Sequence, residues 1–196
     1  MYLSKILGAK IQDSADRTMG ALKDIVIRPQ PGTYAPLQAL CVKDRKSKKI
    51  FYLPYHYVEN IGVGEMSLNI LQEKIIEYKL TQEDILLLRD VMDQQIVDTA
   101  GARVVRVNDL KLGEVEGEMC VLGIDISTRG LLRRLGLTKT GLFNWLHVDL
   151  IDWQQAQPVK GILKLETLSR DLVKLHPADL ANIVEKLNVK QGRALV

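Results

Sequence analysis

Gln95–Leu110, QIVDTAGARVVRVNDL, decides how the chain is interpreted, because Lys10–Ile25, KIQDSADRTMGALKDI, is an earlier version of the same stretch. The two copies align without a gap, with Asp13 on Asp98 and Asp24 on Asp109, so the offset is 85 residues (98 − 13 = 85). A repeat of this length in a chain of 196 residues predicts two similar units in tandem.

Each copy has the pattern of a β-hairpin. Residues 7–13 and 19–27 alternate between apolar and polar positions as strands do. The polar residues 13–18 between them favour a tight turn, because their short side chains hydrogen-bond nearby backbone N–H groups. Gly20 lies just inside the second strand, where a glycine permits a bulge or a close approach of another backbone.

The rest of each unit reads as short β-strands. In the first unit we expect a proline-rich loop at Arg28–Pro36, strands at Leu37–Val42, Ile50–Val58 and Met66–Ile70, and a polar turn at Lys43–Lys49. In the second unit we expect strands at Met119–Ile124 and Leu142–Val148, with a short helix at Ser127–Leu135. Cys120-Val121 aligns with Cys41-Val42, and on that alignment the proline loop is an insertion in the first copy.

Two further segments read as helical. Thr81–Asp84 resembles a capping box, a hydroxyl residue followed three positions later by an acid, and predicts a short helix over Ile85–Asp93. After residue 162 leucines and other apolar residues recur at helical spacing, interrupted at His176-Pro177. The predicted units are therefore 1–80, 81–162 and a helical tail at 163–196, which we expect to be the truncated start of a further domain.

Composition bounds the class of protein. The chain is 46% hydrophobic and 26% charged, the balance of an ordinary globular protein, and its net charge of +3 is too small to argue for nucleic-acid binding by itself. Two cysteines without metal-ligand spacing favour a reducing, cytoplasmic setting. The longest purely apolar run, Ile85–Leu88, is far shorter than a membrane-spanning helix, so no membrane span is expected.

No arrangement of residues in the sequence points to catalysis, so we expect a non-enzyme with no catalytic, cofactor-binding or metal-ligating residues. Asp13, Asp24, Asp98 and Asp109 are either ligands of a divalent cation or, as is more usual for acids at strand ends, turn residues. Tyr52 differs in parity from Tyr55 and Tyr57, which favours packing over a shared base-stacking face. The histidines (His56, His147 and His176) show no zinc spacing, and Cys41 and Cys120 are expected to be small buried apolar residues.

Two basic clusters fall in equivalent connections of the two units. The first is Lys43, Arg45, Lys46, Lys48 and Lys49, and the second is Arg129, Arg133, Arg134 and Lys139. They are either solvated loop faces or, if both units share a fold, a pair of basic ends that meet RNA phosphates or an anionic membrane surface.

The hairpin with an acidic turn and a second aspartate resembles the PRC-barrel, a small β-barrel family that often has an Asp, a Gly three positions later and a Leu-Gly pair. The first copy has Asp13, Met19-Gly20 and Asp24, with Asp16 at the place of the turn glycine; the second has Asp98, Gly101 and Asp109, with Val104-Val105 in place of Leu-Gly. The resemblance covers roughly residues 1–160. It implies a mainly β fold: two small PRC-like β-barrels in tandem, with short helices and a C-terminal helical tail.

The tail adds a second resemblance. Leu175–Leu187, LHPADLANIVEKL, is similar to the opening helix of the intracellular N domain of MgtE-type magnesium transporters, although the continuation Asn188–Gly192 departs from the acidic, proline-containing turn of that family. The combination is similar to bacterial proteins that place PRC-like barrels ahead of an MgtE N-like domain and often a CBS pair.

This combination implies a non-catalytic regulatory or scaffold segment of a magnesium-transporter-like protein, cytoplasmic or on the cytosolic face of a membrane protein. Its expected partner is the downstream helical, CBS or membrane domain of the same protein. Homodimer formation stays open, no cofactor is expected, and Mg²⁺ stays open for the full-length protein. A nucleic-acid partner is not expected from the leading interpretation. It belongs to the alternative, an RNA- or ribosome-associated adaptor, since PRC-like barrels also resemble the C-terminal domain of a ribosome-maturation factor.

Overall fold

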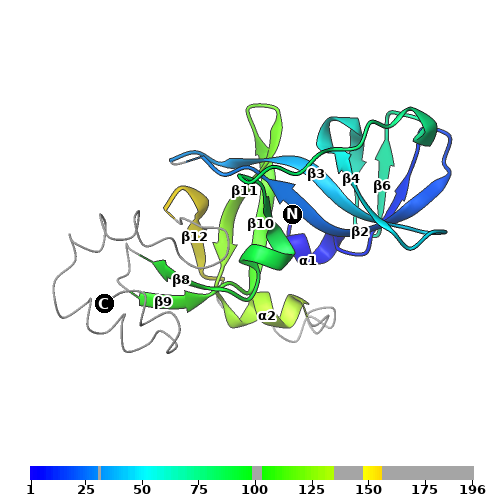
Figure 1. The fold of residues 1–196 in the computed structure, drawn as a ribbon. Coiled ribbons are helices and arrows are strands. Elements are labelled where there is room, and N and C mark those ends of the chain that lie inside the picture. The colour runs from blue at the N-terminus through cyan, green and yellow to red at the C-terminus, as the bar shows by residue number, and fades with distance from the viewer. Residues whose placement is uncertain (31, 99–102, 135–147, 156–196) are drawn as a thin grey trace.

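The computed structural model describes residues 1–196 except residues 31, 99–102, 135–147 and 156–196, and the described part is mainly β (Figure 1). The strands are β1 (Lys10–Gln12), β2 (Thr18–Ile27), β3 (Ala35–Asp44), β4 (Ile50–Pro54), β5 (Val58–Ile61), β6 (Glu65–Leu68), β7 (Ile85–Leu86), β8 (Gln95–Asp98), β9 (Arg103–Arg106), β10 (Asp109–Val115), β11 (Glu118–Asp125) and β12 (Leu150–Asp152). The helices are α1 (Leu3–Ile6), α2 (Thr128–Arg134), the 3₁₀ turns η1 (Tyr55–Tyr57), η2 (Gln72–Lys74) and η5 (Trp153–Gln155), and a π-turn, η3 (Leu87–Val91).

Ten of these strands form one curled, half-barrel sheet in the order β10-β11-β3-β2-β1-β6-β5, with β12 beside β11, β4 beside β3 and β7 beside β2. Strands β8 and β9 form a separate two-stranded ribbon (Figure 1). The long strands β2 and β3 join the two halves of the chain. One end of β2 pairs with β1 and the other with β7, while β3 pairs with β4 over Ala39–Lys43 and with β11 at Ala35 and Pro36.

The repeat at an offset of 85 residues is present in the backbone hydrogen bonds. Gly8 N donates to Leu22 O and Leu22 N donates to Ala9 O, both at 2.9 Å. At the equivalent positions Asp93 N donates to Val107 O and Val107 N donates to Gln94 O, both at 3.0 Å. The hairpin registers agree as well, since Lys10 pairs with Ala21 and Gln95 pairs with Arg106. The alignment that the sequence indicates is therefore reproduced in the structure.

The segments that precede the two hairpins are exchanged between the halves. Residues 1–6 lead into β1 of the first half but lie on β10 of the second half, where Leu112 N donates to Met1 O at 2.8 Å and Tyr2 bridges to Lys111. Conversely, β7 and η3 lead into β8 of the second half but lie on β2 of the first half. Each half thus contributes an arm to the other.

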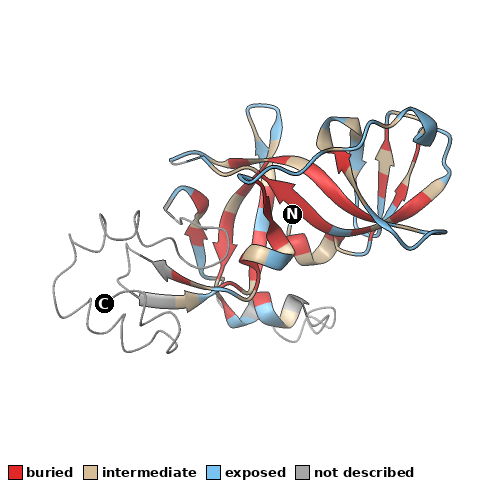
Figure 2. Cartoon of the chain, in the orientation of Figure 1, coloured by how far each residue is buried: buried red, intermediate tan, exposed pale blue. Residues whose placement is uncertain are grey.

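One hydrophobic core runs through both halves. Its buried members extend from Leu3 and Ile6 of the first arm, through Leu22 and Leu40 of the long strands, to Trp153 near the end of the described chain. Figure 2 shows the buried positions following β2, β3, β10 and β11. Because each copy alone is too short for more than a marginal core, sharing one core makes the halves depend on each other for stability.

The structure confirms the first hairpin, the strands at Leu37–Val42 and Met119–Ile124, and the helix after Ser127, whose Oγ accepts the N–H of Gly130 at 3.1 Å. The helix predicted over Ile85–Asp93 is confirmed only as the π-turn η3 at Leu87–Val91, and is wrong for Ile85 and Leu86. Asp84 does accept the N–H of Thr81 at 2.7 Å, as in a capping box, but Ile85 and Leu86 then pair with the free edge of β2 as β7. The strand predicted at Ile50–Val58 is interrupted, because Pro54 ends β4 and η1 follows.

The proline loop is not an insertion in the first copy. Asp24 pairs with Cys41 on the neighbouring strand, and the equivalent Asp109 pairs with Asp125. The two intervals are nearly equal (41 − 24 = 17 and 125 − 109 = 16), so Cys41 corresponds to Asp125 and not to Cys120. The strand predicted at Leu142–Val148, apart from Val148 itself, and the helical tail at 163–196 lie outside the described residues.

Candidate functional site

Asp13 holds the turn of the first hairpin. Its carboxylate accepts the backbone N–H groups of Ala15 and Arg17, both at 3.0 Å, and that of Gln72 at 3.2 Å. The guanidinium of Arg17 also donates to it through Nε at 2.9 Å. The hydrogen bond from Arg17, more than any other contact, holds the pKa of Asp13 well below its usual range. Asp16, at the place of the turn glycine, has a φ of 58°, a left-handed conformation that glycine adopts readily.

Asp24 and Asp109 fix the exchanged arms in place. The buried carboxylate of Asp24 accepts the N–H of its neighbour Ile25 at 2.7 Å, and those of Leu88 and Arg89 in the arm of the second half at 2.7 and 3.0 Å. Asp109 accepts the N–H of Leu110 at 2.9 Å and, from the arm of the first half, the N–H and Oγ of Ser4 at 3.1 and 2.7 Å. Ser4 and Arg89 are equivalent at the 85-residue offset (89 − 4 = 85), so the two caps are reciprocal.

These contacts favour the turn-and-cap interpretation of the aspartates over the metal-ligand one. Asp13, Asp24 and Asp109 each direct both carboxylate oxygens at N–H or O–H donors of the protein. Burial raises the pKa of Asp24, which makes its carboxylate costly to charge and a poor starting point for a cation site. Within the described residues, no group of three His, Cys, Asp or Glu side chains is placed to hold a metal ion. The side chain of Asp98 is outside this description.

The lowered pKa of Asp13 predicts that the protein loses part of its stability as the pH becomes acidic. Its pKa is lowered in the folded state, so its contribution to the free energy of unfolding is present above pH 4 and is lost as the pH falls below the unfolded value of 3.8. We expect Asp13→Asn to be less stable than the native chain at pH 7 and to lose less stability between about pH 4 and pH 2. Urea denaturation at a series of pH values measures this; parallel pH profiles for the two proteins would contradict it.

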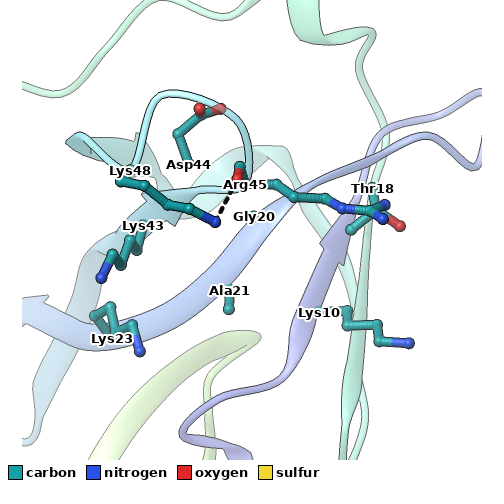
Figure 3. A pocket seen from close by; sticks show the side chains of 9 residues that line it. All are labelled: Lys10, Thr18, Gly20, Ala21, Lys23, Lys43, Asp44, Arg45 and Lys48. Atoms are coloured by element: carbon teal, nitrogen blue, oxygen red, sulfur yellow. Dashed lines mark hydrogen bonds between the residues drawn. The ribbon is translucent and has the colours of Figure 1, made fainter.

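Five cations gather around a hollow of about 480 Å³ on the outer face of β1, β2 and β3 (Figure 3). We call it the basic hollow and define it by five cations: Lys10, Lys23, Lys43, Arg45 and Lys48. One acid, Asp44, also lines it. The floor is formed by Gly20 and Ala21, whose small size leaves the space open.

The β3–β4 turn places the last cations over the hollow. Asp44 accepts the N–H groups of Lys46 at 3.0 Å and Ser47 at 2.5 Å. Hydrogen bonding to the side chain of Ser47, and then to its backbone N–H, lowers the pKa of Asp44. Arg45 N donates to Met19 O at 3.0 Å and so ties the turn to β2. Lys48, in the left-handed conformation with φ 62°, donates from Nζ to Arg45 O at 2.8 Å (Figure 3).

The structure brings together only part of the predicted basic cluster. Lys43, Arg45 and Lys48 line the hollow, whereas Lys46 and Lys49 do not. Lys10 and Lys23 were missed as members of the site, because they come from other strands. The register of the hairpin could have indicated them, because Lys10 pairs with Ala21 and Lys23 is an exposed position of the same strand. Arg129, Arg133, Arg134 and Lys139 of the second cluster have side chains outside the described residues.

The other candidates have structural surroundings. Tyr52 packs over Val26 and Ala39 on the outer face of the sheet, whereas Tyr55 and Tyr57 pack against the main core. Packing is thus confirmed, but Tyr55 and Tyr57 lie in η1 and not in the single strand that the parity argument assumed. His56 is exposed, and His147 and His176 lie outside the described residues. Cys41 and Cys120 are free and buried, and burial raises the pKa of both thiols.

Two further acids are buried: Asp84, which the sequence placed in a capping box, and Asp125, which the sequence interpretation missed. Asp84 receives the Arg28 guanidinium at 3.1 Å, and Asp125 accepts the N–H and Oγ of Ser127 at 2.9 and 2.5 Å, which supports the start of α2. Both reinforce the pattern of carboxylates that organise backbone and turns.

The described residues contain no helix with both the length and the apolar character needed to cross a membrane. Comparison with protein-family models and with curated proteins finds no match to this chain.

Proposed function

We propose that this chain is a non-catalytic scaffold and regulatory segment of a larger, magnesium-transporter-like protein, built from two PRC-like β units. The observation that carries the proposal is the reciprocal exchange of arms, in which Asp24 caps Leu88 and Arg89 while Asp109 caps Ser4. Such interlocking ties two repeats into one body, which suits a part that positions other domains better than a part that opens and closes around a substrate.

Two further observations support it. The buried aspartates Asp24 and Asp109 are engaged with backbone donors that hold the two arms in place. The tail sequence LHPADLANIVEKL, similar to the opening of an MgtE N domain, supplies the partner that the scaffold would position. On this proposal the downstream helical, CBS or membrane domain is the partner, and the segment works on the cytosolic face.

The test uses the whole gene product. Its reading frame beyond Val196 is expected to encode a helical domain, a CBS pair or membrane spans, and a frame that encodes none of them contradicts the proposal. In the full-length protein, limited proteolysis around residues 163–196 is expected to change between magnesium-free buffer and millimolar magnesium. Cleavage that is identical at both concentrations would argue against a regulatory role in magnesium transport.

A further inference from the structure

The basic hollow is built from charges that the sheet register forces together. Lys10 pairs with Ala21 on one side, and Lys43 pairs with Ala21 on the other, so these three residues form one row across β1, β2 and β3. Adjacent strands are about 4.8 Å apart, which puts the backbones of Lys10 and Lys43 about 10 Å apart. Lys23 lies at the register shift of β2 between Leu22 and Asp24, where it is exposed and also lines the hollow.

The one acid in line with this row is Glu65, the register partner of Lys10 on β6. None of the five cations of the basic hollow makes an ion pair with a described acid. Asp44, the one acid in the lining, is occupied by the N–H groups of its own turn. Cations gathered around one hollow raise the local positive potential, although no two of them are paired directly across neighbouring strands. An anion in the hollow would neutralise that potential.

The floor leaves the hollow open, because Ala21, which lies between Lys10 and Lys43 in the row, adds only a single methyl group. The remaining space, about 480 Å³, is large enough for several phosphate groups. Thr18 at its edge adds a hydroxyl donor to the ammonium and guanidinium groups.

The ends of the row limit what can bind. Beyond Lys10 the next residue is Glu65 on β6, and beyond Lys43 it is the exposed, apolar Ile50 on β4. A long polyanion that continued along the row would meet a carboxylate on one side and an apolar residue on the other. The geometry therefore favours a compact, highly charged ligand over an extended nucleic acid.

We propose that the basic hollow is a binding site for an oligophosphate, a small ligand with adjacent phosphate groups such as inorganic triphosphate or a nucleoside triphosphate. The five cations and Asp44 give a formal charge of +4 (5 − 1 = 4), which complements the charge of such a ligand. Lysine ammonium groups on flexible stems and the planar fork of Arg45 are the donors that proteins use for phosphate. The proposal stands independently of the proposed scaffold role.

The test is calorimetric titration of the chain with sodium triphosphate in metal-free buffer at low salt. Two double variants make a matched pair, because both remove two charges from the same turn. Lys43→Gln/Lys48→Gln changes cations that line the hollow, and Lys46→Gln/Lys49→Gln changes cations that do not. We expect the first pair to weaken triphosphate binding about tenfold or more, and the second to change it about twofold or less.

Three results would overturn the proposal. One is the absence of triphosphate binding to the native chain at low salt. Another is an equal loss of affinity in the two double variants, which would mean a diffuse charge effect. The third is an affinity for a single-stranded RNA oligonucleotide, or for anionic phosphatidylglycerol vesicles, that is about a hundredfold higher than the affinity for triphosphate. That affinity would also have to be unchanged by Lys43→Gln/Lys48→Gln. All of these proteins are expected to fold, because the substituted side chains are exposed.

Discussion

Asp24→Ala is expected to lower the free energy of unfolding by about 3 kcal/mol or more, a large part of the stability of a domain of this size. The substitution removes the acceptor for three N–H groups, those of Ile25, Leu88 and Arg89. Two of these belong to the exchanged arm, so the arm loses its attachment to β2 as well as its cap. A buried donor without an acceptor costs about 1–3 kcal/mol. Urea denaturation at pH 7 measures the loss.

Three comparisons make the result specific. Asp109→Ala is expected to show a similar loss, because it removes the acceptor for Ser4 and Leu110 at the reciprocal position. Glu59→Ala, at an exposed position of β5, is expected to stay within about 0.5 kcal/mol of the native chain. Losses below about 1 kcal/mol in both aspartate variants would contradict the capping role.

Asp24→Asn separates the charge of this side chain from its hydrogen bonds. Burial raises the pKa of Asp24, so the stability linked to its protonated form is present below pH 3.8 and is lost as the pH rises through the folded pKa. Asparagine does not titrate. The stability advantage of the native chain over Asp24→Asn is therefore expected to shrink as the pH rises through that range.

The repeat could be predicted because its evidence is local. Asp13 holds the turn of its own hairpin, and Asp24 accepts the N–H of its neighbour Ile25 in addition to two N–H groups of the exchanged arm. Such functions demand a particular residue at a particular spacing, which the offset to Asp98 and Asp109 preserved. The exchange of arms could not be predicted in this way. Ile85–Leu88 is a short apolar run, and its pattern does not tell a strand from a helical turn. The free edge of β2 decided the outcome for Ile85 and Leu86, and that edge is a tertiary feature.

The error over Cys41 and Cys120 has a similar cause. Two matching dipeptides were aligned by identity, whereas hairpin pairing counts positions from the shared aspartate. The basic hollow was predictable only for the cations contributed by one turn, Lys43, Arg45 and Lys48. Lys10 and Lys23 become part of it through the register of β1 and β2, which depends on the bulge between Ile11 and Gln12 as well as on alternation.

Gly20→Val is expected to destabilise the protein by about 3 kcal/mol or more, and to lower its melting temperature by about 6–12 °C. A Cβ at this position would lie 2.3 Å from Lys43 O and 2.9 Å from a methyl carbon of Val42. The first of these contacts is with a backbone atom, so the steric clash is relieved only if β2 and β3 move apart. Gly20→Ala introduces the same Cβ and is expected to produce most of the effect. Thermal unfolding followed by circular dichroism measures both.

The second hairpin supplies the control, because it carries valine at the equivalent position, Val105 (105 − 20 = 85). In the described structure β9 pairs with β8 alone, so no third strand flanks the backbone at Val105, whose side chain packs against the core, whereas Gly20 lies on a strand flanked on both edges. The same residue is therefore tolerated in one copy and excluded from the other by the neighbouring strand. Val105→Gly is expected to cost only about 1–2 kcal/mol, from lost apolar contact and backbone entropy. A neutral Gly20→Ala, or a Val105→Gly as costly as Gly20→Val, would mean that intrinsic strand preference distinguishes the two copies, and not the close approach of β3.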